Sequence, residues 1–265
     1  MELITSTSNP RIKNIVKLQE KASERRAQGL FVVEGAREIG FAVGSGYRIQ
    51  QLFYCEEVTK GREVEVLKLL QMNNVKAELV KVTKDVFSKI AYREGSDGLI
   101  GITKPKDISL EKLQLSKEPL LIILESVEKP GNLGAILRTA DAAKVDAVII
   151  CDPKTDVFNP NVVRASIGTL FTGQIAVCTN DEALNWLKKN RITPYAAALT
   201  ATKSYTEVPL DKSSAIVMGT EANGLSDFWL TKAEQIKIPM LGKIDSLNVS
   251  TSCAVIVFEA VRQRS

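Results

Sequence analysis

The sequence predicts an α/β protein of two domains, the second built on a mostly parallel sheet with helices on both faces. Three observations predict this class. The chain has 265 residues, and 45% of them are hydrophobic, so it can bury a sizeable core. Short apolar runs alternate with helical patterns along most of the chain. A polar, proline-containing stretch interrupts the alternation, and we therefore expect domains at residues 1–105 and 119–265, joined by a linker at 106–118.

The first domain is expected to be a small α/β unit. An amphipathic helix is predicted from Asn9 to Gln28, because Ile12, Ile15 and Leu18 lie on an apolar stripe among basic residues. Strands and helices then alternate. The predicted strands are Leu30–Val33, Gln51–Tyr54, Glu78–Val82 and Gly98–Thr103, and the predicted helices are Glu34–Val43 and Val64–Met72.

The second domain has a sharper pattern. Leu120–Leu124 is an apolar run suited to a strand that is buried on both faces of a parallel sheet. The alternation that follows predicts a doubly wound sheet. The other predicted strands are Ala147–Cys151, Gln174–Val177, Tyr195–Leu199, Ala215–Met218 and Gln235–Ile238. The predicted helices are Gly131–Ala143, Ala183–Lys189 and Thr251–Gln263, with a helical or loop segment at Arg164–Leu170.

The cysteine and histidine content argues against common metal sites. The four cysteines, Cys55, Cys151, Cys178 and Cys253, lack metal-ligand spacing, and the chain contains no histidine. We therefore expect no metal, and we expect the cysteines to be small buried residues rather than disulfide partners. The lack of histidine also removes the commonest general base near neutral pH. We recognise no signal peptide and no membrane-spanning run, so a soluble cytoplasmic protein is expected.

The net charge of +4 is unevenly distributed. Residues 1–105 hold 17 Lys and Arg against 13 Asp and Glu, whereas residues 106–265 hold 18 of each. A basic first domain next to a neutral second domain fits a polyanionic partner such as nucleic acid. A solvated basic surface is the alternative from charge alone.

The first segment suited to chemistry is Glu128–Arg138, which follows a strand and opens a helix. Its Gly131 and Gly134 allow the backbone to approach a ligand closely, and a helix N-terminus favours anions. Arg138 would lie near the opening turn, within reach of a phosphate or a reacting hydroxyl. The alternatives are a plain strand-to-helix turn and a dinucleotide-binding turn, although the G-x-G-x-x-G spacing of the latter is incomplete.

The second segment, Ile216–Ser226, runs from a buried strand into Gly219. Glu221 follows just past the strand end, where α/β sheets bind ligands. The alternative is a turn with a solvent-facing glutamate.

The third segment, Ile238–Ser250, leads into the last predicted helix. Ser250 or Thr251 is the expected N-cap of that helix, which accounts for one hydroxyl. It does not account for Ser246 and Asn248, which precede the cap.

In order and spacing, the three segments resemble the signature motifs of the SpoU family, also called the TrmH family, of RNA ribose 2′-O-methyltransferases. The resemblance extends from about Leu120 to Arg264. The start of the chain is similar to the substrate-binding domain that many members carry, with Ser8–Lys13, a charged helix and Phe31–Gly35 in the expected places.

The resemblance implies an α/β fold with a C-terminal trefoil knot, which general topology rules would exclude. The knot would form the S-adenosylmethionine pocket, and the active site would lie near the interface of a homodimer. The residues implied to be catalytic are Asn132, Arg138, Glu221, Ser246 and Asn248. The residues implied to contact the cofactor are Leu199, Gly219, Ile238, Met240, Leu247 and Ser250.

RNA contacts are expected mainly from the first domain. Its candidate phosphate contacts, which would make binding salt-dependent, are Arg11, Lys13, Lys17, Arg25 and Arg26. In the second domain, Arg164-Ala165-Ser166 resembles a family segment in which an arginine and a serine face the RNA.

The implied reaction is transfer of a methyl group from S-adenosylmethionine to a ribose 2′-hydroxyl, which must be aligned with the sulfonium and lose its proton. Family proposals favour Arg138 as the base or as a phosphate clamp. Because arginine is normally protonated, phosphate-assisted or water-assisted deprotonation is an alternative. Asn132 and Asn248 would position the ribose, and Glu221 would hold its loop or orient Arg138.

Ribosomal RNA is the expected substrate, because an appended N-terminal domain of this type favours it. One alternative is a tRNA ribose 2′-O-methyltransferase, and another is a noncatalytic RNA-binding or ribosome-assembly protein of the same fold. The five intact polar residues argue against the latter. A nicotinamide-dependent enzyme that uses the Gly131–Gly134 turn would lack the rest of its fingerprint.

Overall fold

The computed structural model describes residues 2–92 and 95–265, and the chain divides into two compact units. Unit 1 comprises Met1–Lys106 and Asp156–Thr172, and unit 2 comprises Asp107–Thr155 and Gly173–Ser265. The division differs in two respects from the contiguous domains expected from the sequence. Residues 107–118, most of the expected linker, belong to unit 2. Asp156–Thr172, expected in the second domain, belongs to unit 1.

Unit 1 is built on a mixed five-stranded sheet with the order β1-β4-β3-β5-β2. Strands β1, β4 and β3 run parallel to one another, whereas β5 is antiparallel to both β3 and β2. The four strands predicted for the first domain are confirmed, and β1 was not predicted. The strands are β1 Glu2–Ile4, β2 Phe31–Glu34, β3 Ile49–Tyr54, β4 Glu78–Val82 and β5 Leu99–Thr103.

The helices of unit 1 cover this sheet. They are α1 Pro10–Glu20, α2 Ala22–Gln28, α3 Ala36–Gly44, α4 Glu56–Thr59, α5 Arg62–Met72, α6 Lys84–Ile90, α8 Pro160–Ala165 and α9 Thr169–Thr172. The single helix predicted from Asn9 to Gln28 is wrong, because the backbone is extended at Lys21 and divides it. The physical reason is Arg25, whose guanidinium donates to the freed carbonyls of Leu18 and Gln19 at 2.7 and 3.1 Å.

Two layers of apolar side chains hold unit 1 together. Helices α1 and α6 pack on one face of the sheet, where Ile15, Phe53 and Phe87 share one buried cluster. Elsewhere in unit 1, Phe31 stacks on Phe158, with ring centroids 4.4 Å apart, and on Phe171 at 6.2 Å. These rings explain why Asp156–Thr172 joins unit 1, since their burial contributes on the order of several kcal/mol to the stability of the unit.

Unit 2 is built on a six-stranded sheet with the order β11-β9-β10-β6-β7-β8. Every neighbouring pair runs parallel, which confirms the predicted parallel sheet. The strands are β6 Leu120–Glu125, β7 Ala147–Cys151, β8 Ile175–Cys178, β9 Thr193–Ala197, β10 Ser214–Met218 and β11 Glu234–Ile236. Strands β6, β7 and β10 are buried along their whole length, as expected for strands covered on both faces.

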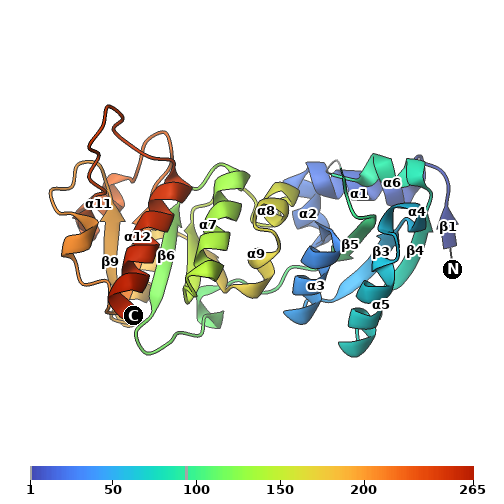
Figure 1. Ribbon diagram of the computed structural model, residues 1–265, viewed down its shortest axis with the longest axis horizontal. Helices are drawn as coiled ribbons and strands as arrows, with labels where there is room; N and C mark the ends of the chain where they lie inside the picture. The colour runs from blue at the N-terminus through green and yellow to red at the C-terminus, as the bar shows by residue number, and fades with distance from the viewer. Residues whose placement is uncertain (1, 93–94) are drawn as a thin grey trace. The chain divides into compact units, whose positions relative to one another are not determined.

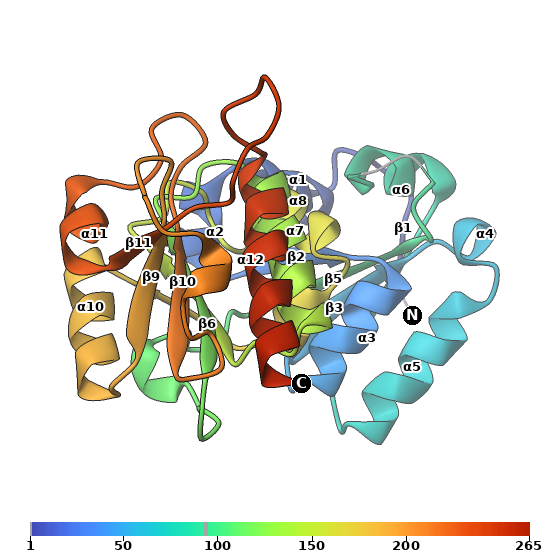
Figure 2. The same ribbon diagram turned by 60° about the vertical axis from the view of Figure 1, so that its left-hand side comes forward.

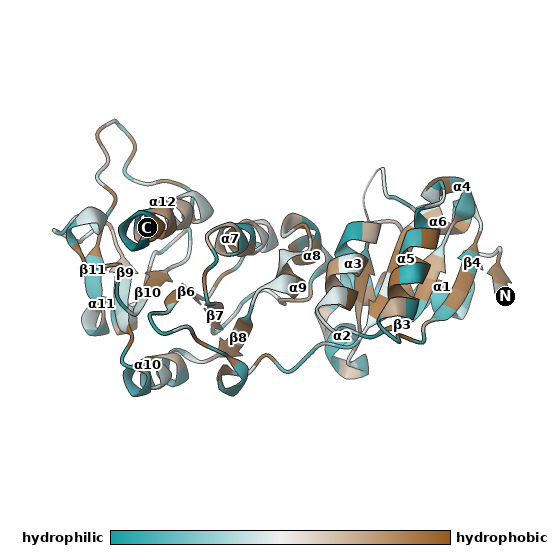
Figure 3. Cartoon of the chain, turned by 60° about the horizontal axis from the view of Figure 1, so that its bottom comes forward, coloured by the Kyte–Doolittle hydropathy of each residue, from teal (hydrophilic) through white to brown (hydrophobic). Residues whose placement is uncertain are grey.

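Helices cover both faces of this sheet. On one face α7, Pro130–Ala142, packs beside α12, Val249–Arg264 (Figure 1, Figure 2). On the other face lie α10, Asn180–Lys189, and α11, Asp227–Lys232, and Figure 3 shows α7 and α10 on opposite sides of the strands. Two short 3₁₀ helices, Leu110–Lys112 and Tyr205–Glu207, complete unit 2.

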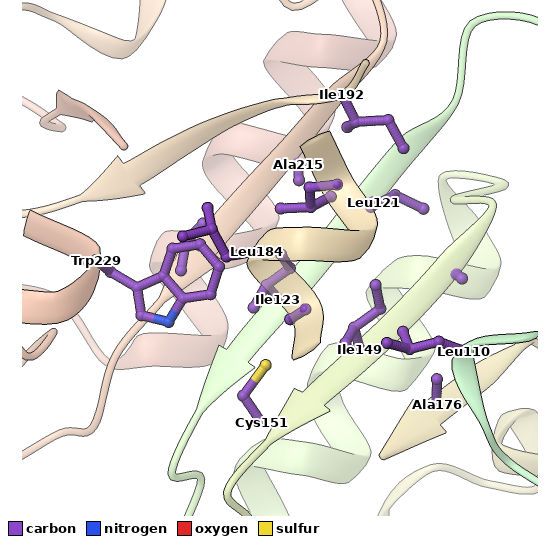
Figure 4. Close-up of a cluster of buried hydrophobic side chains, with 14 of the residues drawn as sticks. Leu110, Leu121, Ile123, Ile149, Cys151, Ala176, Leu184, Ile192, Ala215 and Trp229 are labelled. Atoms are coloured by element: carbon purple, nitrogen blue, oxygen red, sulfur yellow. The ribbon is translucent and has the colours of Figure 1, made fainter. Parts of the chain in front are cut away.

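The core between the sheet and α10 is a dense aliphatic layer. Ile123 and Ile149 from the strands share one cluster with Leu184 of α10 and Trp229 of α11, and each is at most 5% exposed (Figure 4). Burial of side chains of this size contributes about 1.5–3 kcal/mol each. This layer fixes the strands whose ends carry the polar segments described below. In the described part of the chain, the structure contains no helix that is long and apolar enough to span a membrane.

Candidate active site

The three polar segments converge at the carboxyl ends of three parallel strands in one half of the sheet of unit 2. The first follows β6, the second follows β10, which lies beside β6, and the third follows β11 and leads into α12. A cavity of about 720 Å³ opens between the loops that follow β9, β10 and β11 and the start of α12. Because α/β sheets bind ligands at this edge, the cavity is the candidate active site.

Most of the residues predicted for the site line this cavity. They are Leu199, Gly219, Glu221, Ile238, Met240, Ser246, Leu247 and Asn248. Asn132 lines a smaller adjoining hollow, which shares Gly219, Glu221 and Val249 with the large cavity. Ser250 and Arg138 line neither. The roles assigned to all of these residues stay predictions.

The loop after β10, residues 219–225, is held tightly closed. Thr220 and Gly224 form a two-way backbone bridge, with N–O distances of 2.9 and 3.1 Å. Gly224 has a φ of +66°, a conformation that favours glycine. A Cβ on Gly219 would lie 2.2 Å from the carbonyl carbon of Gly224, so no larger residue fits there without opening the loop. These two glycines let the loop present its backbone to the cavity.

Asn248 joins the third segment to the first. Its side-chain Nδ2 donates to Oδ1 of Asn132 at 3.3 Å, across 116 positions of sequence. Its Oδ1 accepts from the backbone N–H of Ser250 at 2.9 Å, so Asn248 is the N-cap of α12. The expectation that Ser250 or Thr251 caps this helix is wrong, because α12 begins at Val249, two residues before the predicted start. The Ser250 hydroxyl instead donates to Oδ1 of Asn248 at 2.6 Å.

Glu221 forms an ion pair with Lys129, which joins the second segment to the first. Both expected roles of Glu221, holding the loop or orienting Arg138, stay predictions. Arg138 is exposed on α7, with no hydrogen bond or ion pair to any residue in 2–92 or 95–265. Sequence reasoning missed Lys129, although its place just before the helix is a signal, since a cation there can meet the glutamate of a neighbouring loop.

Other cavity residues were also missed by sequence reasoning. Thr220 accepts from the backbone N–H of Asn223 at 3.1 Å, which stiffens the loop after β10. Asp245 accepts a hydrogen bond from the hydroxyl of Ser246 at 3.0 Å. Asp245 directly precedes a predicted site residue, and that adjacency is the one signal that could have identified it.

Two thiols near this end of the sheet, those of Cys151 and Cys253, are not candidate bases. Cys253 is fully buried in α12, and burial raises the pKa of its thiol to about 12. Hydrogen bonding to Cys178 and burial raise the pKa of Cys151 as well. Both thiols stay protonated at neutral pH, so neither is a candidate base.

The candidate RNA contacts differ in their exposure. Lys13, Lys17 and Arg26 are exposed on α1 and α2 of unit 1. Arg11 is half-buried, forms an ion pair with Glu78 at 2.7 Å and lies over the ring of Phe53. Arg11 therefore presents only part of its guanidinium to a ligand.

Arg25 must be withdrawn from the predicted RNA contacts. It is 5% exposed, and its guanidinium is occupied by the Asp156 carboxylate at 2.6 Å as well as by the two carbonyls at the end of α1. A charge buried among such partners is not available to phosphate. In the segment with Arg164, that arginine is exposed, but Ser166 is buried and donates to the carbonyl of Val163 at 2.9 Å. Ser166 therefore does not face a ligand.

Comparison with known protein families gives two matches. The model of the SpoU rRNA Methylase family matches residues 119–258. The model of the MRM3-like substrate binding domain matches residues 9–101. Together the two models account for most of both units.

Similar proteins match over nearly their whole length. The 23S rRNA (guanosine(2553)-2′-O)-methyltransferase of Bacillus subtilis is 28% identical, with 97% of this chain and 98% of that protein covered. A solved RNA 2′-O ribose methyltransferase is 36% identical, covers 99% of both chains and has a TM-score of 0.85. An AdoMet-bound rRNA methyltransferase from Sinorhizobium meliloti is 27% identical, covers 98% of this chain and 97% of its own, and has a TM-score of 0.89.

Proposed function

This chain belongs to the SpoU rRNA methylase family, and we propose that it transfers a methyl group from S-adenosylmethionine to a ribose 2′-hydroxyl of ribosomal RNA. The observation that carries the proposal is the convergence of the three polar segments at one cavity, with Asn132 hydrogen-bonded to Asn248 and Lys129 paired with Glu221. Ribosomal RNA is favoured over tRNA because the 23S rRNA enzyme of Bacillus subtilis matches across both units. A ribosomal substrate also agrees with the cytoplasmic location expected from the sequence.

The residues around the cavity fit the proposed cofactor. A volume of about 720 Å³ is in the range of small-molecule and cofactor sites. Leu199, Met240 and Leu247 supply apolar surface for an adenosyl group, and the strand ends supply backbone donors and acceptors at Gly219 and Ile238. When bound, S-adenosylmethionine supplies an electrophilic methyl group on a sulfonium.

We assign the remaining work of the reaction to the polar residues of the three segments. Asn132 and Asn248, linked to each other, orient the ribose so that its 2′-oxygen faces the methyl group. Glu221 holds the loop after β10 through Lys129. Arg138 either accepts the hydroxyl proton or fixes the neighbouring phosphate while that phosphate or water accepts it.

Two variants of Arg138 separate these roles. Arg138→Ala is expected to lower the single-turnover rate at least a hundredfold with little change in cofactor affinity, because Arg138 does not line the cofactor cavity. Arg138→Lys keeps the positive charge, so it should recover part of the rate, with little dependence on pH, if the residue is a phosphate clamp. Because lysine loses its proton more readily than arginine, a base role predicts instead that the rate of Arg138→Lys rises with pH as the lysine ionises. Near wild-type turnover of the alanine variant would remove Arg138 from the mechanism.

A homodimer is part of the proposal, because Arg138 lies outside the cavity of its own chain. In a dimer with the active site near the interface, the exposed side chain of Arg138 meets the site of the second copy. Exposed apolar groups on α12 and the preceding loop, including Phe258 at 48% and Leu247 at 36%, suit such an interface. Light scattering should give about twice the 29.0 kDa mass of one chain.

The activity itself is tested with the cofactor and with cellular RNA. Calorimetry should show uptake of S-adenosylmethionine, and mapping of ribose methylation in cells lacking the gene should reveal one lost rRNA site. Uptake without any lost RNA site would favour a ribosome-assembly role. A lost site in tRNA would correct the substrate, and no uptake would remove the enzyme proposal altogether.

A further inference from the structure

A buried carboxylate lies at the carboxyl end of β6, where the first polar segment begins. Glu125 is the last residue of that strand and is 4% exposed. In residues 2–92 and 95–265, no ion pair of the structure includes it. A buried carboxylate without a cation is costly unless hydrogen bonds satisfy it. Its hydrogen-bond donors therefore indicate which segments Glu125 holds in place.

Three donors from two other segments satisfy Glu125. The backbone N–H of Ser226 donates to Oε2 at 2.8 Å, and the Ser226 hydroxyl donates to Oε1 at 2.5 Å. The side-chain amide of Asn180, at the start of α10, donates to Oε1 at 2.9 Å. Asn180 cannot turn its amide around, because its Oδ1 already accepts from the indole N–H of Trp229 at 2.7 Å.

Ser226 does not use its side chain to cap α11, although it is the N-cap residue of that helix. A serine at that position normally accepts a hydrogen bond from the first turn of its helix. Here the side chain makes no capping hydrogen bond and donates to Glu125 instead. The hydrogen bond between Ser226 and Glu125 does not cap α11. We therefore expect it to hold the segment that precedes Ser226 in the chain.

That segment is the closed loop after β10. Met218 pairs with Leu124 in the parallel ladder, so the loop leaves the sheet next to Glu125. The loop ends at Ser226, which Glu125 holds by two hydrogen bonds. The buried side chain of Glu125 therefore fixes the C-terminal end of the loop at Ser226. Residues 219–225, between β10 and Ser226, line the cavity.

We propose that Glu125 is a positioning residue for the cofactor pocket, which sets the loop of residues 219–225 by holding Ser226. This inference rests on the proposed function, because it takes the cavity to be the S-adenosylmethionine site. Glu125 does not line the cavity, and it acts through Ser226.

Glu125→Gln removes this function with little change of shape. Glutamine offers one oxygen and one NH₂ group to three donors. The Ser226 hydroxyl can turn to accept from the new NH₂ group, but the backbone N–H of Ser226 and the fixed amide of Asn180 cannot turn. At least one donor is then left without an acceptor, and the loop loses part of its anchor.

The test compares cofactor binding with stability in three full-length variants. Calorimetry with S-adenosylmethionine gives the Kd, and thermal unfolding without cofactor gives the Tm. Glu125→Gln is expected to raise the Kd and the KM for the cofactor about tenfold or more, and to lower kcat by a smaller factor. Trp229→Phe is the matched control, because it removes the bond to Asn180 from the same network and leaves both Ser226 bonds in place. Its Tm should fall at least as far, with less than a threefold change in Kd.

The third variant, Ser226→Ala, keeps the backbone bond and should raise the Kd by an intermediate factor. The double variant with Glu125→Gln should lose less affinity than the sum of the two single losses, since both changes weaken the same tether. Additive effects, an unchanged Kd in Glu125→Gln, or equal losses of affinity in Glu125→Gln and Trp229→Phe would each overturn the inference while the wild type still binds. A wild type that takes up no S-adenosylmethionine would contradict the proposed function itself.

Discussion

Asn248 performs two jobs with one side-chain amide. Its oxygen accepts from the backbone N–H and the hydroxyl of Ser250, and its nitrogen donates to Asn132. The same residue therefore starts α12 and ties the third polar segment to the first. The two jobs can be separated because they use opposite ends of the amide group.

Serine and alanine at this position distinguish the two jobs. Asn248→Ser keeps a good helix cap but is too short to reach Asn132, so stability should stay close to wild type while single-turnover methyl transfer falls about tenfold. Asn248→Ala loses the cap as well and should cost about 1 kcal/mol of unfolding free energy. Thermal unfolding and transfer assays give both values. Wild-type turnover in the serine variant would show that the link to Asn132 has no part in the reaction.

At the scale of elements, hydrogen bonds to other segments hold the carboxyl end of α12 as well as its start. The guanidinium of Arg264 donates to the carbonyls of Leu210 at 2.8 Å and of Glu118 and Lys212 at 2.5 Å. These carbonyls belong to the segments that lead into β10 and β6. The end of α12 is therefore hydrogen-bonded to the chain at the amino ends of β6 and β10, the end of the sheet opposite the cavity.

Arg264→Ala leaves these carbonyls without their charged donor. We expect a loss of roughly 2 kcal/mol in unfolding free energy, since hydrogen bonds to charged groups stabilise more than neutral ones. Arg262→Ala is the matched control, two residues away on the same helix. Arg262 pairs with Glu259 of the same helix, and its own side chain is 70% exposed, so its removal should cost clearly less unfolding free energy than removal of Arg264. Chemical denaturation of both variants gives the comparison, and equal losses of unfolding free energy would argue against this role for Arg264.

The same elements show which parts of the fold a sequence can predict. Strands β6 and β10 were predicted closely, because continuous apolar runs follow from burial on both faces. Helix ends were predicted less well. The break at Lys21 depends on Arg25, whose side chain donates to a carbonyl at the end of α1. Near the start of α12, four residues can each cap a helix: Asn248, Ser250, Thr251 and Ser252. Local propensity does not choose among such neighbours.

At the scale of the whole molecule, long-range packing decides what the sequence pattern leaves open. Asp156–Thr172 lies between two strands of unit 2, yet Phe158 and Phe171 pack on Phe31 in unit 1. Periodicity within a short segment carries no sign of such a partner. The candidate site is the converse case, because parallel strands bring their carboxyl ends to one edge. The convergence of the three segments could therefore be predicted, whereas the contacts of Glu125 with Ser226 and Asn180 could not.

The distribution of charge over the molecule leads to the last prediction. Lys13, Lys17 and Arg26 are exposed in unit 1, and each phosphate contact contributes to the salt dependence of binding. Replacing all three by alanine should weaken rRNA binding and lower the slope of log K against log salt by about 2 to 3, as expected for the release of three counterions. Fluorescence anisotropy with a labelled rRNA fragment over a series of salt concentrations measures the slope. The charge-matched control replaces three exposed cations at the end of α10 in unit 2, Lys188, Lys189 and Arg191. Net charge falls equally in both triple variants, so an equal loss of slope would show that overall charge, rather than the helices of unit 1, governs the affinity.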